Sequence, residues 1–194
     1  MINENFVFLG LALSILGGLS YLIDTLKGKT KPNRVTWFFW AAAPLIAFVA
    51  EIQQGVGIQS LLTFIVGFNP LLIFIASFVN KKAYWELRKV DYFCGLLAVL
   101  GIVFWQITDE PNIAIFFAIA ADLVASFPTI IKIMKFPETE NIWIYVAAVL
   151  NGTITLLTFK MWNFEGYAFP LYIVVCSAII AGLIEWRKFV HKVS

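Results

Sequence analysis

The chain has 194 residues, of which 61% are hydrophobic and only 13% are charged. A soluble domain of this length carries about 25% charged residues, so the composition excludes an ordinary soluble protein and indicates an integral membrane protein. The formal net charge of +2 is too small to suggest a nucleic-acid partner. We expect one membrane domain, residues 1–194, with no room for a second.

Uncharged runs bounded by charged residues predict seven transmembrane helices. A helix needs about 20 residues to cross the hydrocarbon core, and open strands are excluded because lipid cannot satisfy their backbone groups. The fold class is therefore all-α transmembrane, with short loops that require the helices to pack as one bundle. The expected spans are residues 5–23, 34–51, one within 52–80, 92–108, 112–131, 141–159 and 167–184.

The basic residues predict the orientation. Of the fourteen Lys and Arg residues, thirteen fall on one side of the predicted membrane and Lys160 alone falls on the opposite side. By the positive-inside rule, the basic side is cytoplasmic. We therefore expect an integral protein of a bacterial cytoplasmic membrane, with the N-terminus outside, the C-terminus in the cytoplasm and the first helix retained. The basic side is defined by Lys27, Lys29, Lys31, Arg34, Lys81, Lys82, Arg88, Lys89, Lys132, Lys135, Arg187, Lys188 and Lys192.

The order of the helices predicts an internal repeat. Repeat one, about 5–80, and repeat two, about 112–186, each hold three helices, and a linker helix at about 91–108 lies between them. Because the linker is a single helix, an odd number, both units cross the membrane in the same orientation. We therefore expect two parallel three-helix repeats that are related by an axis along the membrane normal. A shift of 106 positions aligns Trp37 with Trp143 and gives a few further identities.

The segment that starts at Asp122 and reads Asp-Leu-Val-Ala-Ser-Phe-Pro-Thr-Ile-Ile-Lys-Ile-Met-Lys resembles the PQ-loop motif. In that motif a proline near the cytoplasmic end of a membrane helix precedes a short basic loop. In architecture the whole chain resembles the SWEET-like seven-helix (3+1+3) members of the PQ-loop superfamily, which also includes lysosomal amino-acid exporters and the KDEL receptors. The motif departs from the family at Thr129, where glutamine is expected, and the first repeat has no proline at 20–24.

The same resemblance implies hinge roles for two prolines. SWEETs carry hinge prolines in the first two helices of each repeat, and here Pro44 and Pro128 match that pattern. The first helix lacks such a proline and the sixth has Asn151-Gly152 instead, so sugar specificity does not carry over. The alternative for both prolines is a static kink, because proline frees a carbonyl and bends a helix wherever it lies inside one.

Asp122 is the one charged residue well within a predicted span. A carboxylate at that depth is costly and usually faces a cavity or a partner. Desolvation favours its neutral form, and no Lys or Arg lies at comparable depth to hold it ionised. We therefore interpret Asp122 as a candidate for proton coupling. The alternative is a carboxyl that only hydrogen-bonds a substrate or a neighbouring helix.

Polar and aromatic residues on the helix faces predict a solute site. The alternative for the polar ones is hydrogen bonding between helices, worth about 0.6 kcal/mol each. Trp37 and Trp143 fit an interfacial belt, whereas Trp40 lies one turn deeper, where it can stack on a solute. The candidate substrate-binding residues are Trp40, Asn69, Asp122, Ser126 and Asn151.

The remaining residues argue against an enzyme. His191, the only histidine, lies in the C-terminal tail, and Cys94 and Cys176 lie in apolar runs without metal-ligand spacing. No Gly-rich phosphate loop is present, and we expect no cofactor or metal. We expect a secondary transporter or facilitator of a small polar solute (a sugar, an amino acid or a vitamin-like compound), with a heptahelical receptor or sorting protein as the alternative. The lipid bilayer is the other expected partner, and homo-oligomers remain an option.

Overall fold

The computed structural model describes all residues except 1, 54–56, 84, 108–110, 160–163 and 194. Within this part of the chain there are seven α-helices, two short 3₁₀ helices and no strand. The all-helical fold class and the number of helices are therefore confirmed. The elements are α1 (Phe6–Leu26), α2 (Arg34–Gln53), α3 (Ser60–Ala76), η1 (Lys81–Ala83), α4 (Lys89–Ile107), α5 (Pro111–Lys135), η2 (Pro137–Thr139), α6 (Trp143–Thr158) and α7 (Phe164–Val193).

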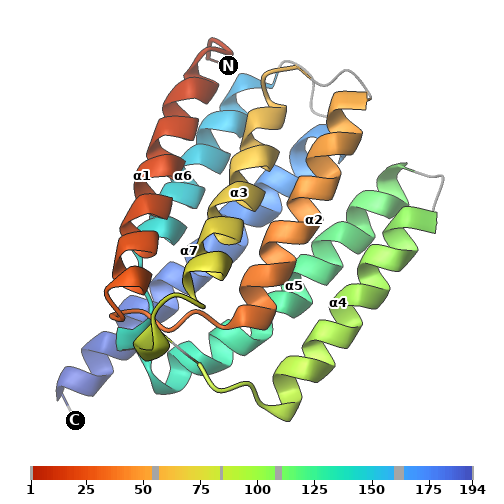
Figure 1. Ribbon diagram of the computed structural model, residues 1–194. Helices are drawn as coiled ribbons and strands as arrows, with labels where there is room; N and C mark the ends of the chain where they lie inside the picture. The colour runs from red at the N-terminus through yellow and green to blue at the C-terminus, as the bar shows by residue number, and fades with distance from the viewer. Residues whose placement is uncertain (1, 54–56, 84, 108–110, 160–163, 194) are drawn as a thin grey trace.

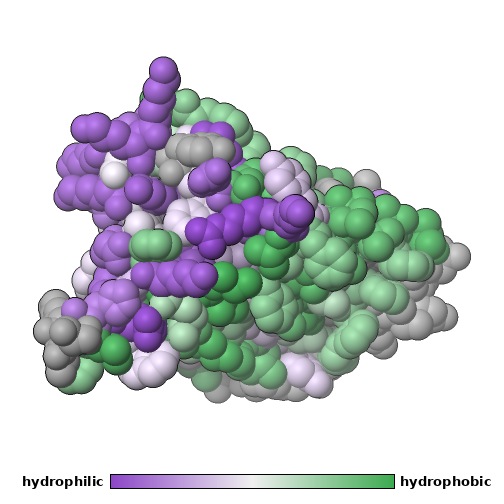
Figure 2. All heavy atoms as spheres, turned by 90° about the horizontal axis from the view of Figure 1, so that it is seen from below, coloured by the Kyte–Doolittle hydropathy of each residue, from purple (hydrophilic) through white to green (hydrophobic). Residues whose placement is uncertain are grey.

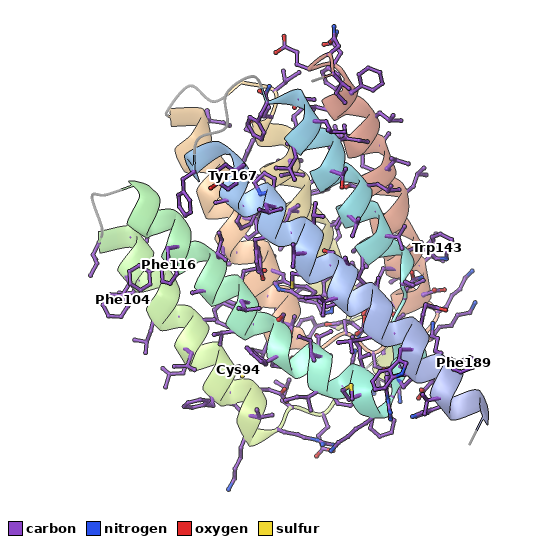
Figure 3. The ribbon with its side chains drawn as sticks, turned by 180° about the vertical axis from the view of Figure 1, so that it is seen from behind. Cys94, Phe104, Phe116, Trp143, Tyr167 and Phe189 are labelled. Carbon is purple, nitrogen blue, oxygen red and sulfur yellow. The ribbon has the colours of Figure 1, made fainter. Side chains whose placement is uncertain are left out.

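Helix α7 departs most from its predicted span, because it continues nine residues beyond Ile184. The continuation contains neither Gly nor Pro, and Glu185 and Lys188 face one another at 3.9 Å, three residues apart. Phe189, which is 67% exposed, lies near the far end of this extension (Figure 3). Charged residues end an apolar run without ending a helix, which is why hydropathy placed this end too early.

Two helices each begin with an asparagine side chain that accepts a backbone N–H group. The Oδ1 atom of Asn33 accepts the backbone N–H of Val35 at 3.0 Å at the start of α2. The Oδ1 atom of Asn141 accepts the backbone N–H of Trp143 at 2.8 Å at the start of α6. The first N–H groups of a helix have no partner within the helix, so these bonds fix where each helix begins.

Six of the helices form a ring. Going round it, the order is α1, α3, α2, α5, α7 and α6, and α6 packs back against α1. Helix α4 lies outside this ring against α5 and α2 (Figure 1). The termini lie at opposite ends of the bundle. Helices that are distant in sequence therefore meet around the centre of the bundle.

Glycines allow the close helix contacts in the ring. A Cβ atom on Gly17 of α1 would lie 2.9 Å from the carbonyl oxygen of Trp143 in α6. A Cβ atom on Gly67 of α3 would lie 3.0 Å from the backbone nitrogen of Leu45 in α2. Small residues at helix interfaces let the backbones approach, as is common where helices pack within membranes.

The outer surface is divided between polar and apolar regions. Figure 2 views the end that carries the C-terminus, where hydrophilic side chains gather on one side and hydrophobic ones cover the other flank. Large apolar side chains are exposed along the helices, including Leu16 at 64% and Phe93 at 60%. Among the described residues, α1 and Tyr167–His191 of α7 are long and apolar enough to cross a membrane, and α3 and α6 are apolar but shorter.

Candidate functional site

A cavity of about 80 Å³ lies at the centre of the ring. A cavity needs roughly 10–15 Å³ to hold one water molecule, so this one has room for several waters or a small solute. All six ring helices contribute to its wall. One lining residue from each of α1, α2, α3, α5, α6 and α7, in that order, is Ser14, Trp40, Asn69, Asp122, Tyr145 and Ser177.

Three of the five predicted binding residues, Trp40, Asn69 and Asp122, line this cavity. The indole N–H of Trp40 donates to the backbone carbonyl of Asp122 at 3.3 Å, which joins α2 to α5. The side-chain amide of Asn69 donates to the backbone carbonyl of Ser14 at 2.8 Å, which joins α3 to α1. These hydrogen bonds hold the wall together across helices and fix the orientation of both side chains.

The other two predicted binding residues do not belong to the cavity wall that the described residues form. Asn151 of α6 is buried, and its amide donates to the hydroxyl of Ser14 at 2.9 Å. Ser126 of α5 is fully buried, and its hydroxyl donates to the carbonyl of Leu123 in the same helix at 2.6 Å. Asn151 therefore acts on the wall through Ser14, and Ser126 lies one turn beyond Asp122.

Asp122 is 4% exposed, and its carboxylate accepts a hydrogen bond from the hydroxyl of Tyr172 in α7 at 2.6 Å. No Lys, Arg or His in the described part of the chain forms an ion pair with it. The sequence predicted the absence of a counter-charge but missed Tyr172. No signal marks that residue in the sequence, because it is one aromatic side chain within an apolar helix.

An aromatic layer, formed by Tyr21, Trp37, Trp40 and Tyr145, borders the cavity. The ring centroids lie 4.6 Å apart for Tyr21 and Trp37, 5.3 Å for Trp37 and Trp40, and 6.2 Å for Trp40 and Tyr145. The interfacial role predicted for Trp37 is wrong, because its side chain is 1% exposed and lines the cavity. Its position in the first turn of α2 faces the interior of the ring. Trp143, in contrast, is 62% exposed at the outer edge (Figure 3).

Next to the aromatic layer lies a buried group that we call the Glu140 cluster: Glu140, Lys132, Tyr21 and Tyr145. Lys132 and Glu140 form an ion pair whose two side chains are inaccessible to solvent. The hydroxyls of Tyr21 and Tyr145 both donate to Oε2 of Glu140, at 2.9 and 3.0 Å. The ammonium of Lys132 also donates to the backbone carbonyl of Lys31. One carboxylate thus joins α1, α5 and α6 at the end of the bundle where the C-terminus lies.

The sequence prediction did not find this cluster, because Lys132 counted as one of many basic residues at the ends of the spans. A signal was available in the face of α5. That face carries Asp122, Ser126 and Thr129, and Lys132 follows Thr129 by three residues, one turn further along. Its partner Glu140 follows η2, and its position depends on a turn that periodicity does not describe.

The two predicted hinge prolines lie inside continuous helices that pack against each other. Pro44 is in α2 and Pro128 is in α5, and both are buried. Their role as hinges stays a prediction.

In the described part of the chain, no group of three or more His, Cys, Asp or Glu residues could hold a metal ion. No protein-family model, curated protein or solved structure matches the chain. The functional assignment therefore has to come from the cavity, the aromatic layer and the Glu140 cluster.

Proposed function

We propose that the protein is a secondary transporter or facilitator that moves a small polar solute across the membrane by alternating access, without ATP. The observation that supports this most is the central cavity, because all six ring helices contribute to its wall. The exposed apolar flanks suit contact with lipid. A solute in such a cavity contacts both halves of the ring, so a tilt of one half against the other changes the side from which the site is reached.

The proposal divides the ring into two three-helix halves, α1–α3 and α5–α7, with α4 as the linker. In each half the third helix packs against both the first and the second. The halves meet where α1 packs on α6 and where α2 packs on α5. A two-fold axis through the cavity would exchange these two contacts. We interpret the halves as the parallel repeats expected for a SWEET-like PQ-loop protein.

A constant offset of 108 residues supports this interpretation. It relates Asn33 to Asn141, the two asparagines that accept backbone N–H groups at the starts of α2 and α6. This offset is two residues larger than the shift of 106 that the sequence identities suggest. It is taken from residues that hold equivalent positions in the two halves, whether or not the residues are identical. The same offset pairs cavity-lining residues of the two halves: Ser14 with Asp122, Trp37 with Tyr145, Trp40 with Ala148, Ile65 with Ile173, and Asn69 with Ser177.

In this proposal the Glu140 cluster closes the cavity on the cytoplasmic side. Tyr21 belongs to the first half, whereas Lys132, Glu140 and Tyr145 belong to the second, so the cluster ties the halves at that end. Tyr145 also lines the cavity, which places the closure directly against the solute site. Opening toward the cytoplasm then requires the separation of Tyr21 from Glu140, while Pro44 and Pro128 provide the bends.

The proposed topology places the N-terminus outside and the C-terminus in the cytoplasm of a bacterial cell. Its motive is the asymmetry of the basic residues along the sequence. Lys160, the one basic residue predicted on the outer side, lies outside the described part of the chain. Single cysteines at positions 2 and 192, treated in intact cells with a membrane-impermeant maleimide, test it. We expect labelling at position 2 alone, and labelling at position 192 would contradict the topology.

The function is tested with purified protein in proteoliposomes, by uptake of a panel of sugars, amino acids, amines and vitamins with and without a pH gradient. Saturable uptake of at least one solute above protein-free vesicles is the expected result. A protein that binds and moves none of these solutes, yet retains one specific protein partner, would instead support a receptor or sorting role.

A further inference from the structure

We infer that the solute of the central cavity is a small organic cation, a compound with an ammonium group and no negative charge. The inference rests on the proposed function, because it concerns the solute that this cavity would carry. Its first ground is charge. Among the described residues that line the cavity, Asp122 is the one acidic side chain, and there is no Lys, Arg or His. An anion would therefore meet a carboxylate and no counter-charge.

The aromatic layer is the second ground. Trp37, Trp40 and Tyr145 all line the cavity, and the planes of neighbouring rings are 79° and 76° apart. Nearly perpendicular rings present both faces and edges to the space beside them. The face of an aromatic ring is negative and attracts a cation within about 6 Å, and several such rings form the usual recognition site for quaternary ammonium groups.

The third ground is that the one buried basic side chain of the described residues is already neutralised. Lys132 pairs with Glu140 and donates to the carbonyl of Lys31, and its side chain has no accessible surface. It does not belong to the cavity wall. A solute carboxylate or phosphate would have to displace Glu140, whose carboxylate also holds two tyrosine hydroxyls.

The fourth ground separates a cation from a sugar. Two side-chain donors of the cavity wall are engaged between helices: Trp40 donates to the carbonyl of Asp122, and Asn69 donates to the carbonyl of Ser14. The buried indole N–H of Trp37 has no hydrogen-bond partner among the described residues, so it is a donor that a solute can use. A sugar presents many hydroxyl oxygens that need donors, and each buried polar group without a partner weakens binding. An ammonium group needs acceptors or aromatic faces only. The hydroxyl of Tyr172 holds the carboxylate of Asp122 in place for this contact.

The experiment compares choline with 3,3-dimethylbutan-1-ol, which has the same shape with a neutral carbon in place of the ammonium nitrogen. Purified protein in proteoliposomes is titrated with each compound, with quenching of tryptophan fluorescence as the measure of binding, since Trp37 and Trp40 line the cavity. Uptake of radiolabelled choline is measured in the same vesicles, with tetramethylammonium, glucose and acetate as competitors. We expect choline and tetramethylammonium to bind at least about tenfold more tightly than the neutral isostere, a difference of about 1.4 kcal/mol.

The matched variants are Asp122→Asn and Glu185→Gln, which remove one negative charge inside the cavity and one at an exposed site on α7. Asp122→Asn should reduce the preference for the cation over the isostere to the part that the aromatic rings provide, and Glu185→Gln should leave it unchanged. Equal binding of choline and its isostere by the unmodified protein, or uptake of glucose or acetate but not of choline, would overturn the cation assignment and leave transport intact. Failure to move any solute of the broad panel would overturn transport as well.

Discussion

The central cavity and the Glu140 cluster are both buried polar regions, yet they treat charge in opposite ways. In the cluster, Lys132 and Glu140 neutralise each other, and two tyrosine hydroxyls donate to the same carboxylate. In the cavity, the carboxylate of Asp122 has a neutral donor, Tyr172, and lies in the wall of the cavity itself. A compensated set of charges fastens helices together. A carboxylate without a counter-charge that lines a cavity is suited to bind a proton or a cation.

The largest effect should come from breaking the ion pair of the cluster. Glu140→Ala leaves the ammonium of Lys132 buried without a counter-charge, which should lower the free energy of unfolding by about 3–5 kcal/mol. Thermal unfolding of the purified protein in detergent measures the loss. The double variant Lys132→Met, Glu140→Leu removes both charges and should recover most of it. If the single and double variants are equally unstable, charge compensation is not what the cluster provides.

A smaller loss should follow when one tyrosine hydroxyl is removed from the cluster. Tyr21→Phe keeps the ring and its packing on Trp37 but removes one hydrogen bond to a charged group, worth about 1.5–3 kcal/mol. Unfolding in detergent is again the measurement. Tyr92→Phe is the control, because Tyr92 is 64% exposed on α4. Equal stability of the two variants would show that Glu140 does not need the Tyr21 hydroxyl.

The smallest effect on stability, and the largest on coupling, is expected in the cavity. Asp122→Asn keeps an acceptor for Tyr172, so the free energy of unfolding should change by about 1 kcal/mol or less. The variant cannot titrate, so accumulation of solute driven by a pH gradient should disappear, while solute exchange survives at solute concentrations that offset the weaker binding. Both are measured in proteoliposomes. Accumulation that persists in this variant would exclude Asp122 as the coupling group and leave facilitated diffusion.

The sequence predicted the features of the fold and the cavity that depend on the local pattern of apolar and polar residues. Uncharged runs found the seven helices, since a buried or lipid-facing helix cannot carry many charges. Asp122 and Asn69 were found because a polar residue within an apolar run is costly unless it faces a cavity or a partner. Both signals are local, and neither requires knowledge of which helices are neighbours.

The parts that depend on the neighbours of a helix were missed. Trp37 was placed at the interface because a tryptophan in the first turn of a span looks the same whether it faces lipid or the ring. Lys132 was counted only as a basic residue at the end of a span, and Glu140 was given no role, although the turn at Pro137–Thr139 returns Glu140 to the end of α5.

The two native cysteines allow the most direct test of the claim that a solute passes through the central cavity. Cys176 lines the cavity, whereas Cys94 is buried in α4, outside the ring (Figure 3). Solute uptake is measured in proteoliposomes that contain the Cys94→Ser or the Cys176→Ser protein, before and after treatment with a small methanethiosulfonate reagent. Uptake by the Cys94→Ser protein should be lost, with protection by excess solute, and uptake by the Cys176→Ser protein should not change. Full uptake by protein in which mass spectrometry shows a modified Cys176 would contradict the claim.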